Sequence, residues 1–332
     1  MIKSLEALLR DSIDYAGLFP PAKLPFPEAF ANYLQYRATN DSWLLARFIL
    51  PLKLFAPFCD TMSRDPQHHH PVRVTTIGGE ASGEVTSVDE LAKELSYLPM
   101  LSESHPHDLH IESYEAKLSQ EIASEIVHFH RVHPLLSSPS TMGERMVSVL
   151  LAQPEPLRVF FEFPIDSGTI TYSQIDVFVK ELAAMQQFLI QSGKDIRVGI
   201  KIRCGGKTPP TAFNIASVIK LVANSPTPVL FKATQGLHHP FYNAQREEPH
   251  GFINLFAATV LTATHHIDSE KKIAEMLTDS DHSKFTFAWE SMRWGEYSVT
   301  LQQIEQARKM FQSIGSCSYD EPREDLRAIG LL

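Results

Sequence analysis

The alternation of short strand-like segments with helix-like segments is the feature that most constrains how this chain folds. Seven apolar-rich segments of strand length recur along it: 44–51, 72–79, 108–115, 159–166, 197–206, 229–236 and 285–292. Between them, stretches such as 88–98, 212–224 and 300–311 carry apolar residues three or four positions apart, as amphipathic helices do. Strands that alternate with helices in this way are joined by crossovers and run parallel.

The number of segments predicts the architecture. An eighth short strand is expected near 314–322, and eight parallel strands with intervening helices form a (β/α)8 barrel. We therefore predict an α/β, TIM-barrel-like fold, irregular in places, as a single domain over residues 1–332. Residues 1–42 are expected to form an N-terminal helical segment, and residues 116–158 a helical elaboration. The DYAGLFPPA stretch (14–22) is expected to cover the barrel bottom, and the alternative is that Asp14 or Tyr15 reaches the site. A doubly wound open sheet is the competing architecture.

The composition of the chain indicates which classes of binding partner and which cellular compartment to expect. The net charge is −9 and no long basic stretch occurs, which argues against a nucleic-acid partner. No apolar run reaches the roughly 18 residues of a membrane span, and the N-terminus lacks a signal-peptide pattern. The three cysteines are far apart and odd in number, which indicates reduced thiols and a cytoplasmic protein. A homo-oligomer is compatible with the sequence.

Charged residues alternate with apolar ones inside the predicted strands. In 229–234, Lys232 shares a face with Leu230 and Thr234, opposite an apolar face. In a barrel the apolar face packs against helices, so the interior would receive His110, Glu112, Glu162, Lys201, Arg203, Lys232 and Glu290. Such a buried cluster persists only if its charges compensate one another, either as a functional site or as a structural network.

Two lysines on neighbouring strands suggest a chemistry. Lys201 and Lys232 would repel each other, and burial would also disfavour their charge, so that Lys201 lowers the pKa of Lys232. A partly neutral Lys232 could form a Schiff base with a carbonyl or act as a base. The alternative is that both lysines neutralise a bound carboxylate or phosphate. Glu162 or Glu290 would relay protons in the catalytic version.

The stretch RCGGKTPPT (203–211) connects a strand to a helix. Gly205 and Gly206 allow the backbone to approach a ligand, and the helix that follows favours an anion, although a plain tight turn is the alternative. The spacing excludes a Walker A motif. We assign substrate binding to a set of side chains and glycines near the expected rim: Glu112, Arg203, Gly205, Gly206, Thr234 and His250.

Three histidines follow the strand that carries Lys232. His238 and His239 are expected at the mouth of the barrel as catalytic acid or base groups, with loop ordering as the alternative. No cofactor is predicted. A divalent metal held by His239, His250 and Glu162 is the alternative site, although no HExxH or CxxC spacing supports it.

Five motifs in order, DYAGLFPPA, KIRCGG, FKATQGLHHP, HGFINLF and GSCSYDEP, resemble those of a family of hypothetical bacterial proteins. LHHP and GSCS are the most specific of them. The resemblance implies that the chain is one structural unit. It implies no substrate and assigns no catalytic residue. That family has Thr at the position of Cys204, which argues against a chemical role for this thiol.

Together these patterns predict a barrel enzyme that acts on a small anionic carbonyl metabolite by lyase, aldolase-like or isomerase chemistry with an active-site lysine. A metal-dependent hydrolase or isomerase with His and Glu ligands is the second hypothesis. A ligand-binding barrel without catalysis is the third.

Overall fold

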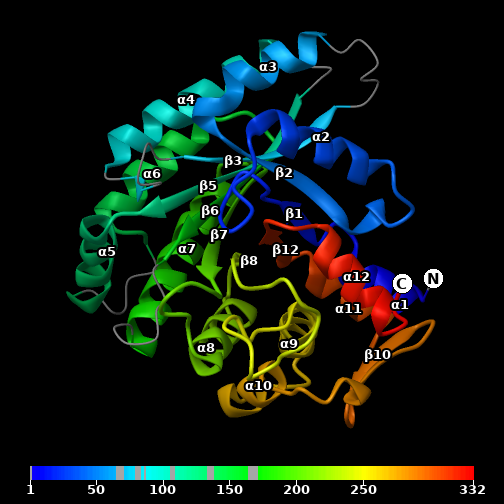
Figure 1. The fold of residues 1–332 in the computed structure, drawn as a ribbon. Coiled ribbons are helices and arrows are strands. Elements are labelled where there is room, and N and C mark those ends of the chain that lie inside the picture. The colour runs from blue at the N-terminus through cyan, green and yellow to red at the C-terminus, as the bar shows by residue number, and fades with distance from the viewer. Residues whose placement is uncertain are drawn as a thin grey trace.

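A closed barrel of parallel strands occupies the centre of the molecule, and helices surround it (Figure 1). The computed structural model describes residues 2–64, 71–78, 84–85, 87–104, 109–132, 138–163 and 171–332. The eight barrel strands are β1 (Ile13–Tyr15), β2 (Leu45–Pro51), β3 (Val72–Ile77), β5 (Leu109–Leu118), β6 (Leu157–Glu162), β7 (Ile196–Arg203), β8 (Leu230–Thr234) and β12 (Phe311–Ser316). They pair in the order β3-β2-β1-β12-β8-β7-β6-β5, and β3 pairs with β5 to close the ring. The predicted (β/α)8 barrel is confirmed.

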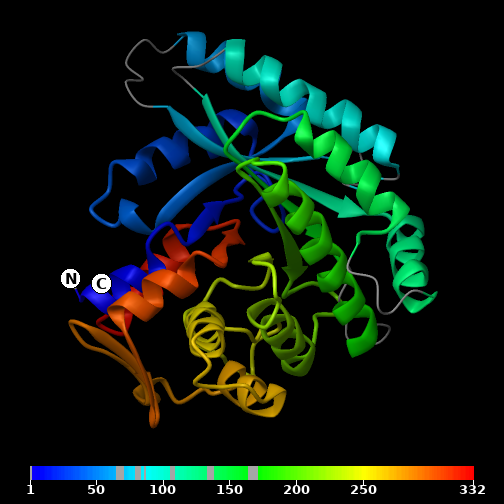
Figure 2. The same ribbon diagram turned by 180° about the vertical axis from the view of Figure 1, so that it is seen from behind.

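The helices form the outer layer, which Figure 2 shows from behind. They are α1 (Lys3–Leu9), α2 (Phe26–Arg37), α3 (Phe55–Arg64), α4 (Val88–Ser104), α5 (Gln120–Val132), α6 (Thr141–Leu151), α7 (Tyr172–Gln191), α8 (Ala212–Ala223), α9 (Phe252–Ala263), α10 (Glu270–Leu277), α11 (Leu301–Arg308) and α12 (Asp320–Ala328). Short 3-10 turns cover Ser42–Leu44, Leu52–Leu54 and His282–Lys284. Within the described part of the chain, none of these helices has the length and apolar character needed to cross a bilayer.

The main core lies between the barrel strands and the helices. In β7, Val198, Ile200 and Ile202 are completely buried and alternate with residues that face the barrel interior. Several helices begin at a threonine whose side chain caps the first turn. Thr171 and Thr300 each form a capping box with a Gln three residues later, which fixes where α7 and α11 begin. The short β4 (Glu84–Val85) pairs with β5 beside the ring.

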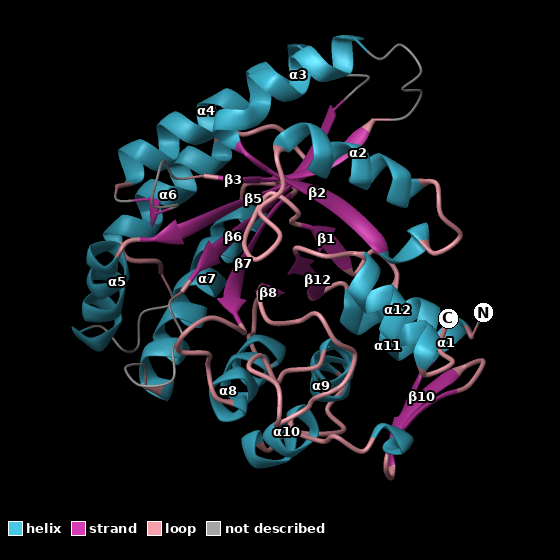
Figure 3. Cartoon of the chain, in the orientation of Figure 1, coloured by secondary structure: helices cyan, strands magenta, loops and turns pink. Residues whose placement is uncertain are grey.

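The prediction that residues 285–292 form a barrel strand is wrong. They contribute β9 (Phe285–Phe287) and β10 (Ser291–Trp294), which form a separate antiparallel sheet with β11 (Tyr297–Thr300). Figure 3 shows β10 at the periphery of the molecule. Gly295, with φ +56°, lies in the turn that joins β10 to β11. Alternation of apolar and polar residues suits a two-faced antiparallel sheet as well as a barrel strand, so the pattern alone did not separate them.

The strand that completes the barrel comes instead from the N-terminal segment. β1 is only three residues long and lies inside 1–42, between the helices α1 and α2. It pairs in parallel with β12 on one side and β2 on the other. The DYAGLFPPA stretch therefore begins inside the barrel wall and continues past the C-terminal end of β1, rather than covering the barrel bottom.

Candidate active site

The two predicted lysines lie side by side inside the barrel. Lys201 of β7 and Lys232 of β8 are register partners, and both are buried. Glu115 of β5 contacts both of them, with Oε2 2.7 Å from Lys201 Nζ and Oε1 2.5 Å from Lys232 Nζ. One carboxylate therefore lies between two buried lysine side chains, which reduces the repulsion between them.

Lys232 is held deeper in the barrel than Lys201. Its Nζ also contacts Asp14 of β1, and its side chain is completely buried. Asp14 in turn accepts hydrogen bonds from Ser313 Oγ at 2.8 Å and from Arg47 Nη1 at 3.2 Å. Burial alone would raise the pKa of Asp14, but Lys232 and Arg47 lower it to about 2. Asp14 is thus an ionised carboxylate at the centre of the molecule.

On the other side of Glu115, the ion pairs continue toward the C-terminal ends of the strands. Lys201 Nζ lies 3.0 Å from Glu162 Oε2, and Arg203 Nε lies 2.7 Å from Glu162 Oε1. Burial would lower the pKa of Lys201, but the Glu115 and Glu162 carboxylates outweigh it and raise that pKa. Burial would likewise raise the pKa of Glu162, but Lys201 and Arg203 lower it. Both groups are charged at neutral pH.

These contacts form one continuous chain of alternating charges, which we call the interior ion chain. It runs through Arg73, Glu112, Arg47, Asp14, Lys232, Glu115, Lys201, Glu162 and Arg203. It begins near the N-terminal ends of the strands and finishes at Arg203, the last residue of β7. Because each charge lies between opposite charges, the chain offsets much of the desolvation cost of its burial.

A pocket of about 390 Å³ opens where the interior ion chain ends. It lies at the C-terminal ends of the barrel strands, the end at which barrel enzymes carry their sites. Its walls combine residues of the loop after β1, the ends of several strands and the loop after β8: Ala16, Phe19, Pro20, Pro21, Ile49, Pro51, Lys53, Ile77, Gly78, Glu115, Lys117, Glu162, Lys201, Arg203, Thr234, Gln235, His238, Gly315 and Cys317. We call it the C-terminal pocket.

The C-terminal pocket carries more positive than negative side chains. Among the residues that the structure describes, four Lys or Arg residues border it, against the two carboxylates Glu115 and Glu162, which already pair with lysines and Arg203. The Arg203 side chain remains 52% exposed, so its guanidinium is accessible at the pocket wall. This charge balance favours an anionic ligand.

Five predicted site residues border this pocket: Glu162, Lys201, Arg203, Thr234 and His238. Lys232 lies behind it, because its side chain has no exposed surface. The prediction that Lys201 acts as the neighbour that lowers a lysine pKa is not supported, since Glu115 separates the two charges and the pKa of Lys201 itself is raised.

Two predicted carboxylates lie elsewhere. Glu290 is exposed in the turn between β9 and β10, outside the barrel, and cannot relay protons in this pocket. Glu112 faces the interior but near the opposite end, where its carboxylate lies 2.7 Å from Arg47 Nε and from Arg73 Nε. A register shift in the pairing of β3 with β5 falls at Glu112 and changes which later residues face inward, so that Glu115 takes the expected place of Glu112.

The three histidines do not converge on one site: His238 and His239 both lie within ion-pair distance of Glu321, and His250 contacts a different loop. His238 Nδ1 lies 3.3 Å from Glu321 Oε2 and 3.3 Å from Ser316 Oγ. His239 Nδ1 lies 2.6 Å from Asp325 Oδ2 on α12, and the adjacent Glu321 is also within ion-pair distance. His238 alone of the three borders the pocket, so His239 is not supported as a catalytic group.

His250 is buried, and its Nε2 lies 3.2 Å from the carbonyl oxygen of Pro210. Burial lowers the pKa of His250, which keeps this ring neutral at physiological pH. Its role is to join the loop after β8 to the loop before α8, rather than to bind substrate in the C-terminal pocket. Across the described ranges, no group of three or more His, Cys, Asp or Glu residues could hold a metal ion. The alternative set His239, His250 and Glu162 is therefore not supported.

Gly205 and Gly206 allow a close approach between loops. The loop after β7 packs directly on the loop after β8, and a Cβ placed on Gly205 would lie 2.8 Å from the Cα of Gly236. Neither Gly205 nor Gly206 is among the described residues that border the C-terminal pocket. Gly205 is explained by this packing, which positions Arg203 and Thr234 at the pocket wall, and Gly206 by its positive φ of +98°.

This packing leads to a stability prediction. We expect Gly236→Ala to lower the free energy of unfolding by about 2–3 kcal/mol, because φ is +72° and the new Cβ would lie 2.7 Å from the Cα of Gly205. Gly193→Ala is a matched control, since Gly193 has the same φ and no atom within 4 Å of the added Cβ. It should cost only about 1 kcal/mol. Urea unfolding of both variants measures the difference, and equal costs would exclude the steric account.

The buried Asp14 carboxylate predicts a pH dependence of stability. Its pKa is about 2 in the folded protein and 3.8 in the reference state. A depressed pKa contributes stability that is present above the unfolded value and is lost as the pH falls, here by about 2 kcal/mol between roughly pH 5 and pH 2. Glu115 and Glu162, whose pKa values are also lowered, act in the same direction. Unfolding free energies measured over this range should fall less steeply in Asp14→Asn than in the wild type, and identical slopes would contradict the assignment.

Two interior residues, Arg47 and Glu115, escaped the sequence-based prediction, and Asp14 was expected to reach the site only as the alternative to covering the barrel bottom. For Glu115 a partial signal existed, because it alternates with the apolar residues Tyr114, Ala116 and Leu118, but this alternation is out of step with that of Leu109 and Ile111 earlier in the strand. Arg47 similarly alternates with buried Ala46 and Phe48 in β2.

Comparisons of the chain with protein-family models, with curated proteins and with solved structures give no match. The resemblance to the bacterial family therefore stays a prediction, and the function is argued from the site alone.

Proposed function

We propose that this barrel is an enzyme that acts on a small anionic carbonyl compound by lyase- or isomerase-type chemistry, with Lys201 as the active-site lysine. The observation that carries the proposal is the position of Lys201. Its Nζ lies between Glu115 and Glu162 at the wall of the C-terminal pocket, and the half-exposed Arg203 guanidinium borders the same pocket. A cation for the anionic group and a second cation for the reacting carbonyl are thus available together.

The charge state of Lys201 favours one of the two lysine chemistries. A Schiff base requires a neutral amine, whereas the raised pKa of Lys201 keeps it as an ammonium. An ammonium can donate a hydrogen bond to a carbonyl oxygen and stabilise the negative charge that develops there. Lys232 is completely buried behind the pocket, so we assign it to positioning Glu115 rather than to substrate.

The proposed reaction proceeds through an enolate. A base removes the proton next to the carbonyl, the electron pair moves to the carbonyl oxygen, and Lys201 stabilises that oxygen. For a 2-hydroxy carbonyl compound this enolate is an enediolate: the former carbonyl oxygen gains a proton, the neighbouring hydroxyl loses its proton and becomes the new carbonyl, and return of the carbon-bound proton to the former carbonyl carbon completes the isomerisation. In the lyase direction, cleavage of the carbon–carbon bond gives the same enolate, while the base takes the hydroxyl proton of the departing carbonyl product. Glu162 and His238, which border the pocket, are the proposed proton-transfer groups.

Proton exchange with solvent tests the proposal on many carbonyl compounds in parallel. The wild-type protein would be incubated in D2O with a panel of 2-oxo acids, 3-oxo acids and sugar phosphates, and the proton next to the carbonyl would be followed by NMR. We expect enzyme-dependent loss of that signal for at least one compound. Borohydride reduction of the same mixtures, followed by mass mapping of the protein, tests whether a lysine forms a Schiff base instead. An adduct on Lys201 would replace the enolate mechanism by a Schiff base, and neither exchange nor an adduct would leave a ligand-binding barrel.

A further inference from the structure

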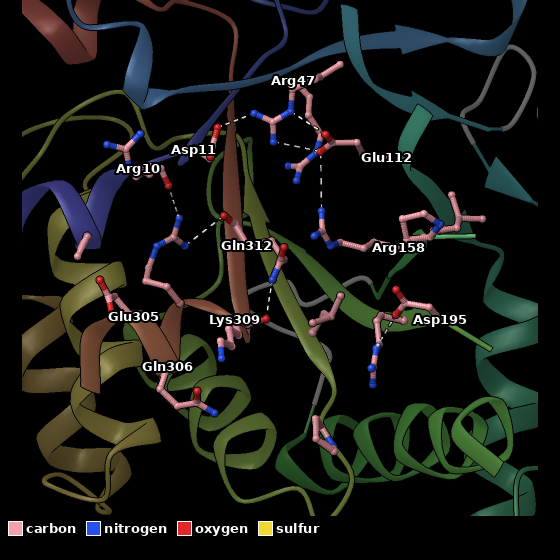
Figure 4. Close-up of a pocket in the computed structure, with 18 of the residues that line it drawn as sticks. Arg10, Asp11, Arg47, Glu112, Arg158, Asp195, Glu305, Gln306, Lys309 and Gln312 are labelled. Carbon is pink, nitrogen blue, oxygen red and sulfur yellow. Dashed lines mark hydrogen bonds and ion pairs between the residues drawn. The ribbon is translucent and has the colours of Figure 1, made fainter. Parts of the chain in front are cut away.

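A second, larger cavity lies at the opposite end of the barrel. Its volume is about 950 Å³, and its walls include residues at the N-terminal ends of the strands, such as Arg73 of β3, Arg158 of β6 and Arg197 of β7. Figure 4 shows its labelled side chains around a common space, with the Arg158 side chain extending toward Glu112. We call it the N-terminal cavity. The proposed enzymatic function makes no use of it.

The N-terminal cavity is rich in positive charge. Of the described residues that border it, eight are Lys or Arg and five are Asp or Glu, in a protein whose net charge is −9. A local excess of three positive charges in an acidic protein is not a consequence of overall composition. Such an excess in a concave site attracts anions.

Four of the five carboxylates that border the cavity in the described chain are already paired with arginines. Glu112 lies 2.7 Å from both Arg47 Nε and Arg73 Nε, and Arg47 also pairs with Asp14. Arg158 reaches only this same Glu112, at 3.8 Å, and its side chain is 39% exposed. Burial lowers the pKa of Arg158, and repulsion from Arg47 contributes to the same shift. Within the described residues, Arg158 has no carboxylate of its own.

Arg308 is a second cation of the cavity that has no ion-pair partner among the described residues. Its guanidinium donates to backbone carbonyls, at 3.1 Å to Gln312 and 2.9 Å to Arg10, and lies 4.5 Å from the centre of the Phe256 ring. No carboxylate of the described chain lies within 4.0 Å of it, and its Nε is buried without a hydrogen-bond partner there. Burial lowers the pKa of Arg308 more than nearby Asp11 raises it. A partly buried cation that has no counter-ion in the described chain is costly, and a bound anion would reduce that cost.

We propose that the N-terminal cavity binds a small anion with more than one phosphate or carboxylate group, and that Arg158 and Arg308 contribute to its binding. The guanidinium fork of arginine matches phosphate and carboxylate oxygens in a bidentate manner, which a lysine cannot do. The cavity is far larger than a single phosphate ion requires, and its cations are spread over several strands and α11. Both features favour a multiply charged ligand over a single monovalent ion.

Titration calorimetry with inorganic pyrophosphate and with citrate tests this proposal on the full-length protein. We expect at least one probe to bind with one-to-one stoichiometry and to weaken as the salt concentration rises from about 50 to about 200 mM. The probe that binds more tightly distinguishes phosphate from carboxylate chemistry.

Matched arginine variants assign the site. Arg158→Met should weaken binding by about tenfold or more, and Arg158→Lys by less, because the charge stays but the fork is lost. Arg145→Met removes an exposed arginine on α6, and Arg203→Met removes the arginine of the C-terminal pocket, so both should bind the probe as the wild type does. The absence of binding by both probes would overturn the proposal. An equal loss in Arg145→Met or Arg203→Met would overturn it as well, since the probe would then be bound nonspecifically or in the other pocket.

Discussion

Replacing Glu115 by Gln is expected to lower the free energy of unfolding by about 3–5 kcal/mol, the cost of removing one partner from a buried ion pair. Glu115 is 1% exposed and is the shared carboxylate of Lys201 and Lys232. The amide would remove the charge that lies between them, and two buried lysines would then face each other. The shape of the side chain is almost unchanged, so the loss reports electrostatics rather than packing.

Chemical unfolding at neutral pH measures this effect, and an exposed ion pair supplies the control. Glu275 pairs with Lys272 on the surface of α10 at 3.1 Å, and Glu275→Gln should change the free energy of unfolding by less than about 0.5 kcal/mol. If Glu115→Gln lowered the free energy of unfolding as little as Glu275→Gln does, Glu115 would not be the buried counter-ion that we describe.

Replacing Lys201 by Met is expected to lower the rate of substrate deuterium exchange by about 10²- to 10³-fold, the effect of removing one donor to a developing oxyanion. The variant should lose stability, as Glu115→Gln does, but should stay folded, because Glu115 keeps Lys232 as a partner and Glu162 keeps Arg203. Lys201→Arg retains the positive charge in a different geometry and should recover part of the rate.

Lys180→Met is the matched control for this prediction. Lys180 lies on the outside of α7, where its side chain is 59% exposed and pairs with Asp176. Exchange rates of the control should equal those of the wild type, and circular dichroism would verify that each variant is folded. Unchanged exchange in Lys201→Met would remove this lysine from the mechanism, whatever the stability of the variant.

The barrel could be predicted because its helices and most of its strands carry strong patterns. β7 shows the reason, since Val198, Ile200 and Ile202 alternate with Gly199 and Lys201 over a long segment. β1 could not be predicted in the same way. Three residues are too few to show a period, and the central one is an aspartate whose burial depends on Lys232, more than 200 positions away in the sequence.

The candidate site was predicted only in part, because some of its residues lie in regular strands and others depend on long-range contacts. Strand alternation placed Glu162, Lys201 and Arg203 correctly, because β6 and β7 pair in a regular register. Which residues of β5 face the barrel interior depends on an irregularity at Glu112, and this irregularity is visible only in the pairing of β5 with β3. Glu290 was assigned to the interior because local alternation does not specify which sheet a strand joins. The ion pairs of the histidines with α12 are likewise long-range contacts that no local pattern encodes.

The most direct test of the account is a crystal structure of the protein with the carbonyl compound that exchanges fastest in the deuterium screen. We predict that the compound occupies the C-terminal pocket, with its carbonyl oxygen within hydrogen-bond distance of Lys201 Nζ and its anionic group on Arg203. Binding at any place from which Lys201 cannot reach the carbonyl oxygen would contradict the proposed enzyme.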